Sequence, residues 1–217
     1  MGRIPRWARY LTVLACIAVD ALICTGAHAQ PLEPPPTVSA RALPGLLATL
    51  KAGGHILYFR HLDTRQDQED DQPVNLQDCS RQRNLSPEGE ARGRAIARVL
   101  LQAGLRFDQV LVSPFCRTRD SGRLLFGKTL DDQDLFFAIG LNDAEKVGKG
   151  TALRRLLARM PAKGANTAIV GHTANLQEAV GLWPKPEGVA YVFKPDGQGG
   201  VAVIARIPPE AWASAAR

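Results

Sequence analysis

Short apolar runs alternate with stretches of helical periodicity from residue 43 onward. The first run, Ile56 to Phe59, follows Gly53-Gly54 and ends in Arg60-His61. Apolar runs of this length between turn residues are typical of strands buried on both faces. The same pattern predicts further strands at 110–112, 135–139, 167–170, 189–193 and 201–207. The glycine-rich residues 196–200 would join the last two as a hairpin.

Apolar side chains at helical spacing separate these strands. Leu43, Leu46, Leu47 and Leu50 predict a short helix that ends at Gly53-Gly54. Ser86-Pro87 is typical of a helix start, and that helix should run to Gly104. Further helices are expected at 118–125, 153–160 and 174–180. This alternation predicts an α/β fold: a three-layer α/β/α domain with a mainly parallel central sheet and a C-terminal antiparallel hairpin at its edge.

The N-terminal 29 residues have the pattern of a cleavable signal peptide. Three arginines precede an apolar segment, and Ala27-His28-Ala29 is an A-x-A cleavage site, so the mature chain would start at Gln30. Asp20 argues against the alternative of an uncleaved membrane anchor, because a carboxylate in the bilayer is costly. We therefore expect a periplasmic or secreted protein without a stable membrane span. Residues 30–40 would be an extended Pro-rich leader, and residues 41–217 the domain.

Composition and charge narrow the range of partners. The charged fraction of 22% and apolar fraction of 45% are values of a globular chain. Removing three arginines and one aspartate with the signal lowers the net charge from +6 to +4. No Lys/Arg block is present, so no nucleic-acid partner is expected. Cys79 and Cys116 would remain as the two cysteines of an exported chain, which favours a disulfide over two buried thiols.

Residues 62–83 form a long, acidic, aperiodic segment. A connection of this length in a compact domain is commonly a lid or disordered. We interpret it as a flap over a site, with a solvated loop as the alternative. Its carboxylates do not match the calcium-loop spacing, so no metal is inferred from them. No cofactor is expected for the chain.

Four cationic or imidazole side chains follow separate predicted strands. Arg60 and His61 end the first strand, Arg117 follows the second, and His172 ends the fourth. Ligands of open α/β sheets bind beyond the carboxyl ends of the strands. Two guanidiniums there offer forked donors to a phosphate. His55 begins a strand at the opposite rim and is interpreted as structural.

These residues carry a family resemblance. Arg60 to Thr64 (RHLDT) resembles the RHGxT signature of the histidine phosphatase superfamily, also called phosphoglycerate mutase-like. SPFCRTRDSG, from Ser113, is similar to its S-x-x-x-R-x-x-x-T-A segment, and IVGH, ending at His172, to its V-x-H segment. The exported context and the Cys-containing loop resemble the periplasmic branch that includes the lipopolysaccharide core heptose phosphatase.

The resemblance implies a mechanism and site residues. His61 would attack phosphorus and form a phosphohistidine, while Arg60, Arg117 and His172 would stabilise charge on the phosphoryl oxygens. Related enzymes often place the general acid after the third strand. This makes Asp143 the preferred candidate and Glu145 the next, with Asp63 as the outsider.

Two departures from the family pattern bear on activity. Leu62 stands where the family has Gly or Ala, which predicts a narrower pocket or an altered turn. Ser121-Gly122 replaces Thr-Ala.

Three functions follow from the resemblance. The preferred one is an exported, metal-independent phosphomonoesterase acting on a small phosphate ester or an envelope sugar phosphate. The alternatives are a mutase-type phosphotransferase and a non-catalytic phosphate-binding module. No protein partner is implied.

Overall fold

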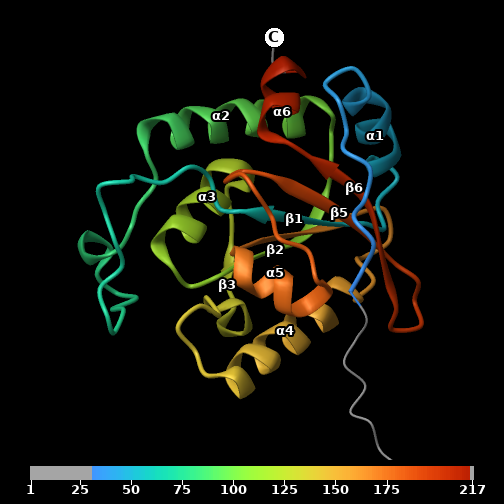
Figure 1. Cartoon of the computed structure of the whole chain (residues 1–217). Coiled ribbons are helices and arrows are strands. Elements are labelled where there is room, and N and C mark those ends of the chain that lie inside the picture. The colour runs from blue at the N-terminus through green and yellow to red at the C-terminus, as the bar shows by residue number, and fades with distance from the viewer. Residues whose placement is uncertain (1–30, 216–217) are drawn as a thin grey trace, which may run out of the picture.

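A computed structural model of the protein describes residues 31–215. The expected signal peptide and its cleavage site after Ala29 lie outside the described residues. The sheet has six strands in the order β3-β2-β4-β1-β5-β6 (Figure 1). The strands are β1 (Ile56–Arg60), β2 (Phe107–Val112), β3 (Leu130–Asp131), β4 (Asn166–Gly171), β5 (Ala190–Pro195) and β6 (Val201–Ile207). The first four are parallel, whereas β5 is antiparallel to both β1 and β6.

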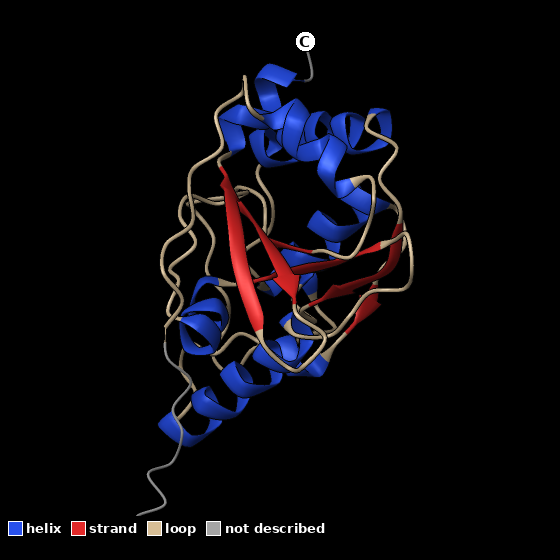
Figure 2. Cartoon of the chain, turned by 90° about the vertical axis from the view of Figure 1, so that its right-hand side faces the viewer, coloured by secondary structure: helices blue, strands red, loops and turns tan. Residues whose placement is uncertain are grey.

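Helices cover both faces of the sheet, as Figures 1 and 2 show. One face carries α1 (Leu43–Leu50), α2 (Pro87–Gln102), α3 (Cys116–Phe126) and α6 (Pro209–Ala215); the other carries α4 (Asp143–Leu157) and α5 (Thr173–Val180). The predicted three-layer α/β/α architecture with an antiparallel edge hairpin is therefore confirmed.

Strand β1 is buried on both faces. Leu57 and Phe59 pack with the core of the α2 face, while Ile56 and Tyr58 pack with the core beneath α4 and α5. Because successive side chains of a strand point to opposite faces, an unbroken apolar run fills both cores. This central position places the end of β1 in the middle of the sheet rim.

The expected strand at 135–139 is wrong. The strand in this region is the earlier β3, and a 3-10 helix at Gln133–Leu135 and a loop follow it. Leu135 packs into the core, and Phe136 and Phe137 pack against Phe115 instead of pairing in the sheet. An apolar run of this length does not by itself distinguish a strand from packed irregular chain.

Several element bounds also differ from expectation. Helix α3 starts at Cys116, so Arg117 lies in its first turn. Helix α4 starts at Asp143 behind an Asn142–Glu145 capping box and ends before residue 160. The sequence pattern did not indicate α6.

Residues 31–40 are extended and form backbone hydrogen bonds with the rest of the domain. The backbone amide of Val38 donates to the Arg206 carbonyl, and Leu32 donates to Val180, each at 2.8 Å. The leader therefore runs along β6 and reaches α5. Within the described residues, no helix has the length and apolarity needed to cross a membrane.

Candidate active site

The two site histidines meet at the rim because their strands are neighbours. Strands β1 and β4 are parallel, with Arg60 in register with Gly171. The residues that follow, His61 and His172, have ring centroids 5.6 Å apart. His61 donates its backbone amide to the Gly171 carbonyl at 3.0 Å. Sheet pairing therefore fixes the separation of the two imidazoles.

His61 has one ring nitrogen committed to the backbone. Its Nδ1 lies 2.9 Å from the Leu62 carbonyl oxygen. A carbonyl only accepts, so Nδ1 carries the hydrogen and the lone pair of a neutral ring lies on Nε2. Burial lowers the pKa of His61 well below 6.5, and Arg117 and Arg60 lower it further. The geometry thus favours a neutral imidazole with Nε2 as the nucleophilic atom.

His172 is enclosed by aromatic rings. Phe137 stacks on it with centroids 4.4 Å apart, and Phe115 meets it edge-on at 5.1 Å. Its Nε2 lies 2.8 Å from the Ser113 hydroxyl, and the Tyr58 hydroxyl donates to its carbonyl at 2.7 Å. Burial lowers the pKa of His172 well below 6.5, with Arg117 as the next cause. Its buried Nδ1 has no hydrogen-bond partner among the described residues.

Arg117 reaches the rim from the first turn of α3. Its side chain is 3% exposed, and its guanidinium lies over the Phe115 ring, 4.6 Å from the centroid. Nη1 donates to both carboxylate oxygens of Asp70, at 2.8 and 2.9 Å. A buried guanidinium needs a partner charge, and here the flap provides it.

Arg60 is held by a different carboxylate. Its Nη2 donates to Oε1 of Glu187 at 3.0 Å, and its Nη1 donates to the Pro184 carbonyl at 3.3 Å. Arg83, at the end of the flap, donates to the same Oε1 at 3.2 Å. Thr64 donates its amide to Oε2 at 2.8 Å. Glu187 therefore ties both ends of the flap to the loop before β5.

Sequence reasoning brought four residues together and missed others. His61, His172, Arg60 and Arg117 converge as expected. Arg83, Glu187, Asp70 and Phe137 were not singled out, and Ser113 was named only as the first residue of a motif, without a role in the site. Only Ser113, which directly follows a strand, carried a local signal that could have identified it.

Leu62 does not narrow the pocket. Its side chain is completely buried in the core on the α2 face. A Cβ on Gly93 would lie 2.5 Å from Leu62 Cδ1, and one on Gly89 would lie 2.1 Å from the Asp63 carbonyl oxygen. Two glycines one turn apart thus let α2 pass closely over the segment after the nucleophile. The larger residue at position 62 is accommodated by space on the helix.

The three general-acid candidates have different surroundings. Asp143 is fully exposed at the start of α4, with Lys146 at 3.4 Å. Glu145 accepts from the Asn142 amide in the capping box. Asp63 is partly buried and accepts from Arg92 at 2.9 Å. Burial raises the pKa of Asp63, and Arg92 counteracts part of this effect.

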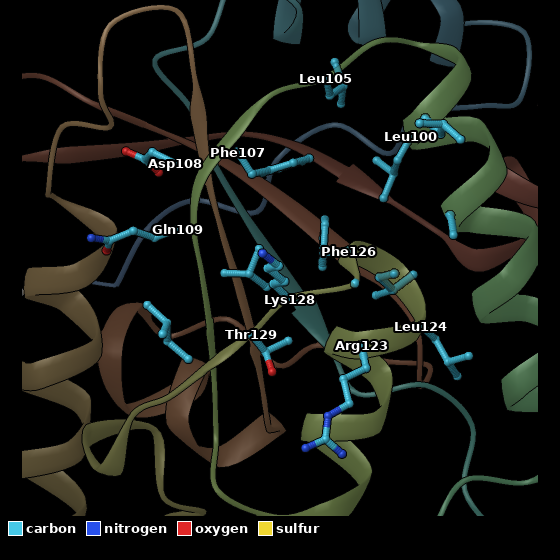
Figure 3. Close-up of a pocket in the computed structure, with 16 residues that line it drawn as sticks. Leu100, Leu105, Phe107, Asp108, Gln109, Arg123, Leu124, Phe126, Lys128 and Thr129 are labelled. Atoms are coloured by element: carbon cyan, nitrogen blue, oxygen red, sulfur yellow. The ribbon is translucent and has the colours of Figure 1, made fainter.

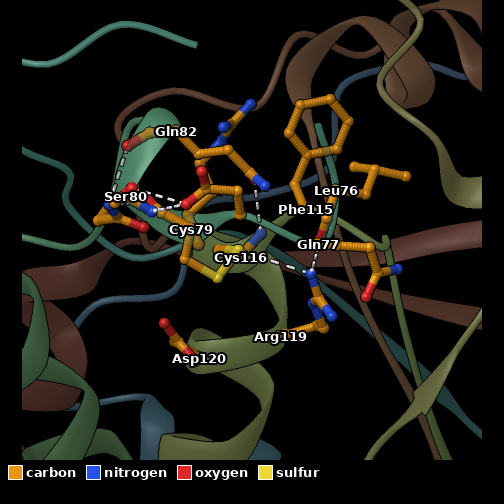
Figure 4. Close-up of a disulfide and its surroundings, with 12 residues drawn as sticks. Leu76, Gln77, Cys79, Ser80, Gln82, Phe115, Cys116, Arg119 and Asp120 are labelled. Atoms are coloured by element: carbon orange, nitrogen blue, oxygen red, sulfur yellow. Dashed lines mark hydrogen bonds between the residues drawn. A yellow bond between two sulfur atoms is a disulfide. The ribbon is translucent and has the colours of Figure 1, made fainter. Parts of the chain in front are cut away.

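The expected disulfide between Cys79 and Cys116 is present and anchors the flap (Figure 4). Cys116 directly precedes Arg117 in α3. Its amide donates to Oε1 of the buried Gln82 at 3.0 Å, a second tie between flap and helix. Residues near both ends of the flap, and Asp70 between them, contact the site. This arrangement fits the flap interpretation better than that of a solvated loop.

A groove on the surface lies away from the histidines. It has a volume of about 680 Å³ and lies between the C-terminal parts of α2 and α3 and the β2–β3 edge (Figure 3). Leu100, Phe107 and Phe126 line it, and none of the site residues does. Among residues 31–215, no three His, Cys, Asp or Glu side chains gather as a metal site.

The fold of this chain is similar to that of solved structures. No protein-family model and no curated protein matches this chain. The protein histidine phosphatase SixA, solved with tungstate, is 20% identical over 71% of this chain and 97% of its own, with a TM-score of 0.51. Phosphoserine phosphatase from Entamoeba histolytica, solved with 3-phosphoglyceric acid, is 14% identical over 73% and 98%, with a TM-score of 0.50. The chain therefore has the α/β fold of these phosphatases.

Proposed function

We propose that the protein is a metal-independent phosphomonoesterase that works through a phosphohistidine. The observation that carries this proposal is the pairing of His61 Nε2, free of its proton, with a second histidine and two arginines at one rim. A neutral imidazole is a nucleophile, and fixed guanidiniums complement the charge of a phosphoryl group.

The reaction would proceed in two displacements. His61 Nε2 forms a bond to phosphorus while the ester P–O bond breaks and its electron pair leaves with the alkoxide. Arg60, Arg117 and His172 stabilise charge on the phosphoryl oxygens. Water then attacks the phosphohistidine, releasing inorganic phosphate and restoring the imidazole. The Nδ1 hydrogen bond to Leu62 holds the ring in the required tautomer throughout.

A carboxyl group would protonate the leaving alkoxide. Asp63 and Asp143 are the two candidates with distinct support. Asp63 lies two residues from the nucleophile, and burial raises its pKa, the direction that favours a general acid. Asp143 follows the loop of Phe137, which stacks on His172. We favour Asp63, since Asp143 is fully exposed.

We further propose an exported enzyme acting on a small phosphate ester or an envelope sugar phosphate, as in the heptose phosphatase branch. The disulfide supports export, because such bonds persist in oxidising compartments. The fold shared with a phosphatase solved with tungstate, a phosphate-like oxyanion, supports phosphate as the reacting group.

The test uses the mature chain and a panel that includes an aryl phosphate, sugar phosphates and a phosphohistidine protein. We expect hydrolysis and an acid-labile, base-stable phosphoenzyme. His61→Ala should abolish the adduct and lower turnover by roughly 10⁴-fold or more. His55→Gln, at the opposite end of β1, is the matched control and should retain both. Absence of both turnover and the phosphoenzyme adduct across the panel would refute the proposed phosphatase activity.

The general acid is tested with the same substrates. Asp63→Asn should slow the hydrolysis of alkyl phosphates by roughly 10²-fold or more. The hydrolysis of aryl phosphates should slow much less, because a phenolate leaves without being protonated. The same selectivity in Asp143→Asn, with Asp63→Asn unaffected, would assign the acid to Asp143. Transfer to an added sugar in preference to water would indicate a mutase-type phosphotransferase.

A further inference from the structure

Two carboxylates of the chain already occupy the arginines of the site. Asp70 contacts Arg117, and Glu187 contacts Arg60 and Arg83. Their side chains are only 16% and 12% exposed. An incoming phosphate therefore meets guanidiniums whose charges are already partly neutralised.

The cluster's charge indicates that one carboxylate leaves. Arg60, Arg83 and Arg117 against Asp70 and Glu187 leave one net positive charge. A phosphate monoester dianion added to all five groups would leave one uncompensated negative charge in a largely buried site, which is costly. If the dianion replaces one carboxylate, the cluster becomes neutral.

The hydrogen bonds indicate which carboxylate leaves. Glu187 accepts from Arg60, Arg83 and both the amide and hydroxyl of Thr64. Asp70 accepts from Arg117 and from the Arg83 amide at 3.0 Å. Both Arg117 contacts come from the single atom Nη1, whereas the strongest guanidinium pairs use two nitrogens. The Asp70 contact is therefore the weaker one, and phosphate offers Arg117 a better partner.

We propose that Asp70 is an internal ligand of Arg117 that substrate phosphate displaces, whereas Glu187 stays and positions Arg60 and Arg83. This rests on the proposed function only in that the anion is a phosphate. The flap keeps Asp70 close: Asp71 donates its amide to Arg81, and the disulfide joins the flap to α3 beside Arg117. A tethered competitor reduces the apparent affinity of every ligand at this position by the same factor.

The test compares Asp70→Asn with wild type by calorimetric titration of inorganic phosphate into the mature chain. We expect Asp70→Asn to bind phosphate about tenfold more tightly, because the competing negative charge is gone. The KM for a phosphomonoester should fall by a similar factor. Asp71→Asn is the matched control: Asp71 pairs with the exposed Arg81, and its phosphate affinity should stay within about twofold of wild type.

Other roles of Asp70 give opposite results. If Asp70 positioned Arg117, the variant would bind phosphate more weakly. If Asp70 were the general acid, the variant would hydrolyse alkyl phosphates more slowly but aryl phosphates at the wild-type rate, and its affinity for phosphate would be unchanged. Either result, or no phosphate binding by either protein, would overturn the proposal that phosphate displaces Asp70 from Arg117. Tighter phosphate binding by Asp70→Asn without any turnover would support the displacement of Asp70 and refute the proposed phosphatase activity. Turnover with an unchanged phosphate affinity would support the phosphatase activity and refute the displacement of Asp70.

A crystal structure of the wild-type chain with phosphate provides a readout that does not depend on how the variant folds. The 2.8 Å contact between Asp70 and Arg117 should be replaced by a phosphate oxygen, with the contacts of Glu187 retained. Phosphate bound with the Asp70 contact intact would overturn the proposal.

Discussion

The two arginines of the site are held in unlike ways. Arg60 ends a central strand, and its carboxylate partner lies on the short loop before β5. Arg117 lies in the first turn of a helix, and its partner comes from the middle of a long flap. The first half of the site is built from the sheet and its adjoining loop, whereas the second half depends on a segment without regular structure around Asp70. Binding residues on rigid elements are preorganised, and those on loops are adjustable.

The comparison is tested most strongly by removing each arginine. Arg117→Ala and Arg60→Ala should each lower kcat/KM by about 10²–10³-fold, the usual cost of losing one donor to the transition-state charge. Only Arg117→Ala should also loosen the part of the flap around Asp70, because it deletes the charged partner of Asp70. Hydrogen exchange of residues 62–83 in the two variants measures this difference. Equal protection of the flap in both would contradict the assignment of Asp70 to the Arg117 half.

Glu187→Gln tests the fixed half with a smaller expected effect. The amide keeps the size of the side chain but loses the charge that holds Arg60 and Arg83. We expect a loss of about tenfold or more in kcat/KM, since hydrogen bonds to charged groups contribute about 1.5–3 kcal/mol. Exposed Glu210→Gln is the control. Unchanged kinetics in Glu187→Gln would show that the two arginines are positioned without it.

The pH dependence of stability gives the smallest expected effect and reports on the centre of the site. Burial lowers the pKa of His61 well below 6.5, so between that pKa and 6.5 the unfolded chain binds a proton that the folded chain does not. Stability should therefore be complete above pH 6.5 and fall as the pH drops below it. The loss should be about 1 kcal/mol at one pH unit below, for each such histidine.

Denaturant unfolding of wild type and His61→Gln at pH 7.5 and 5.5 measures this contribution. The variant should lose less stability on acidification than wild type, because position 61 no longer takes up a proton when the chain unfolds. An equal loss in both proteins would show that His61 titrates in the fold as it does in the unfolded chain.

The fold and the meeting of the four residues at one rim could be predicted because their signals are local. A buried strand is recognisable as an apolar run, and parallel strands bring their carboxyl ends together wherever they lie in the sequence. Topology therefore brings Arg60, His61 and His172 to one rim, and Arg117 joins them from the helix that follows β2. The false strand at 135–139 had the same local signal, but its phenylalanines are used for packing around His172.

The missed residues depend on contacts across the chain. Glu187 lies more than 100 residues from each of its three partners in the sequence. The role of Asp70 depends on how an aperiodic flap folds, and no periodicity encodes that. The expectation that Leu62 narrows the pocket was wrong for the same reason: the space that accommodates Leu62 is provided by Gly93 on another element.

The disulfide has a practical consequence for handling the protein. Cys79 and Cys116 couple the covalent state of the chain to the position of Asp70, since the bridge attaches the flap to the helix turn of Arg117. Thiol reductants in a purification buffer, or production in a reducing cytosol, would yield a chain whose flap is held by hydrogen bonds and ion pairs alone. Preparations made with and without reductant should then differ in KM, so the redox history of a sample belongs with every kinetic constant measured for it.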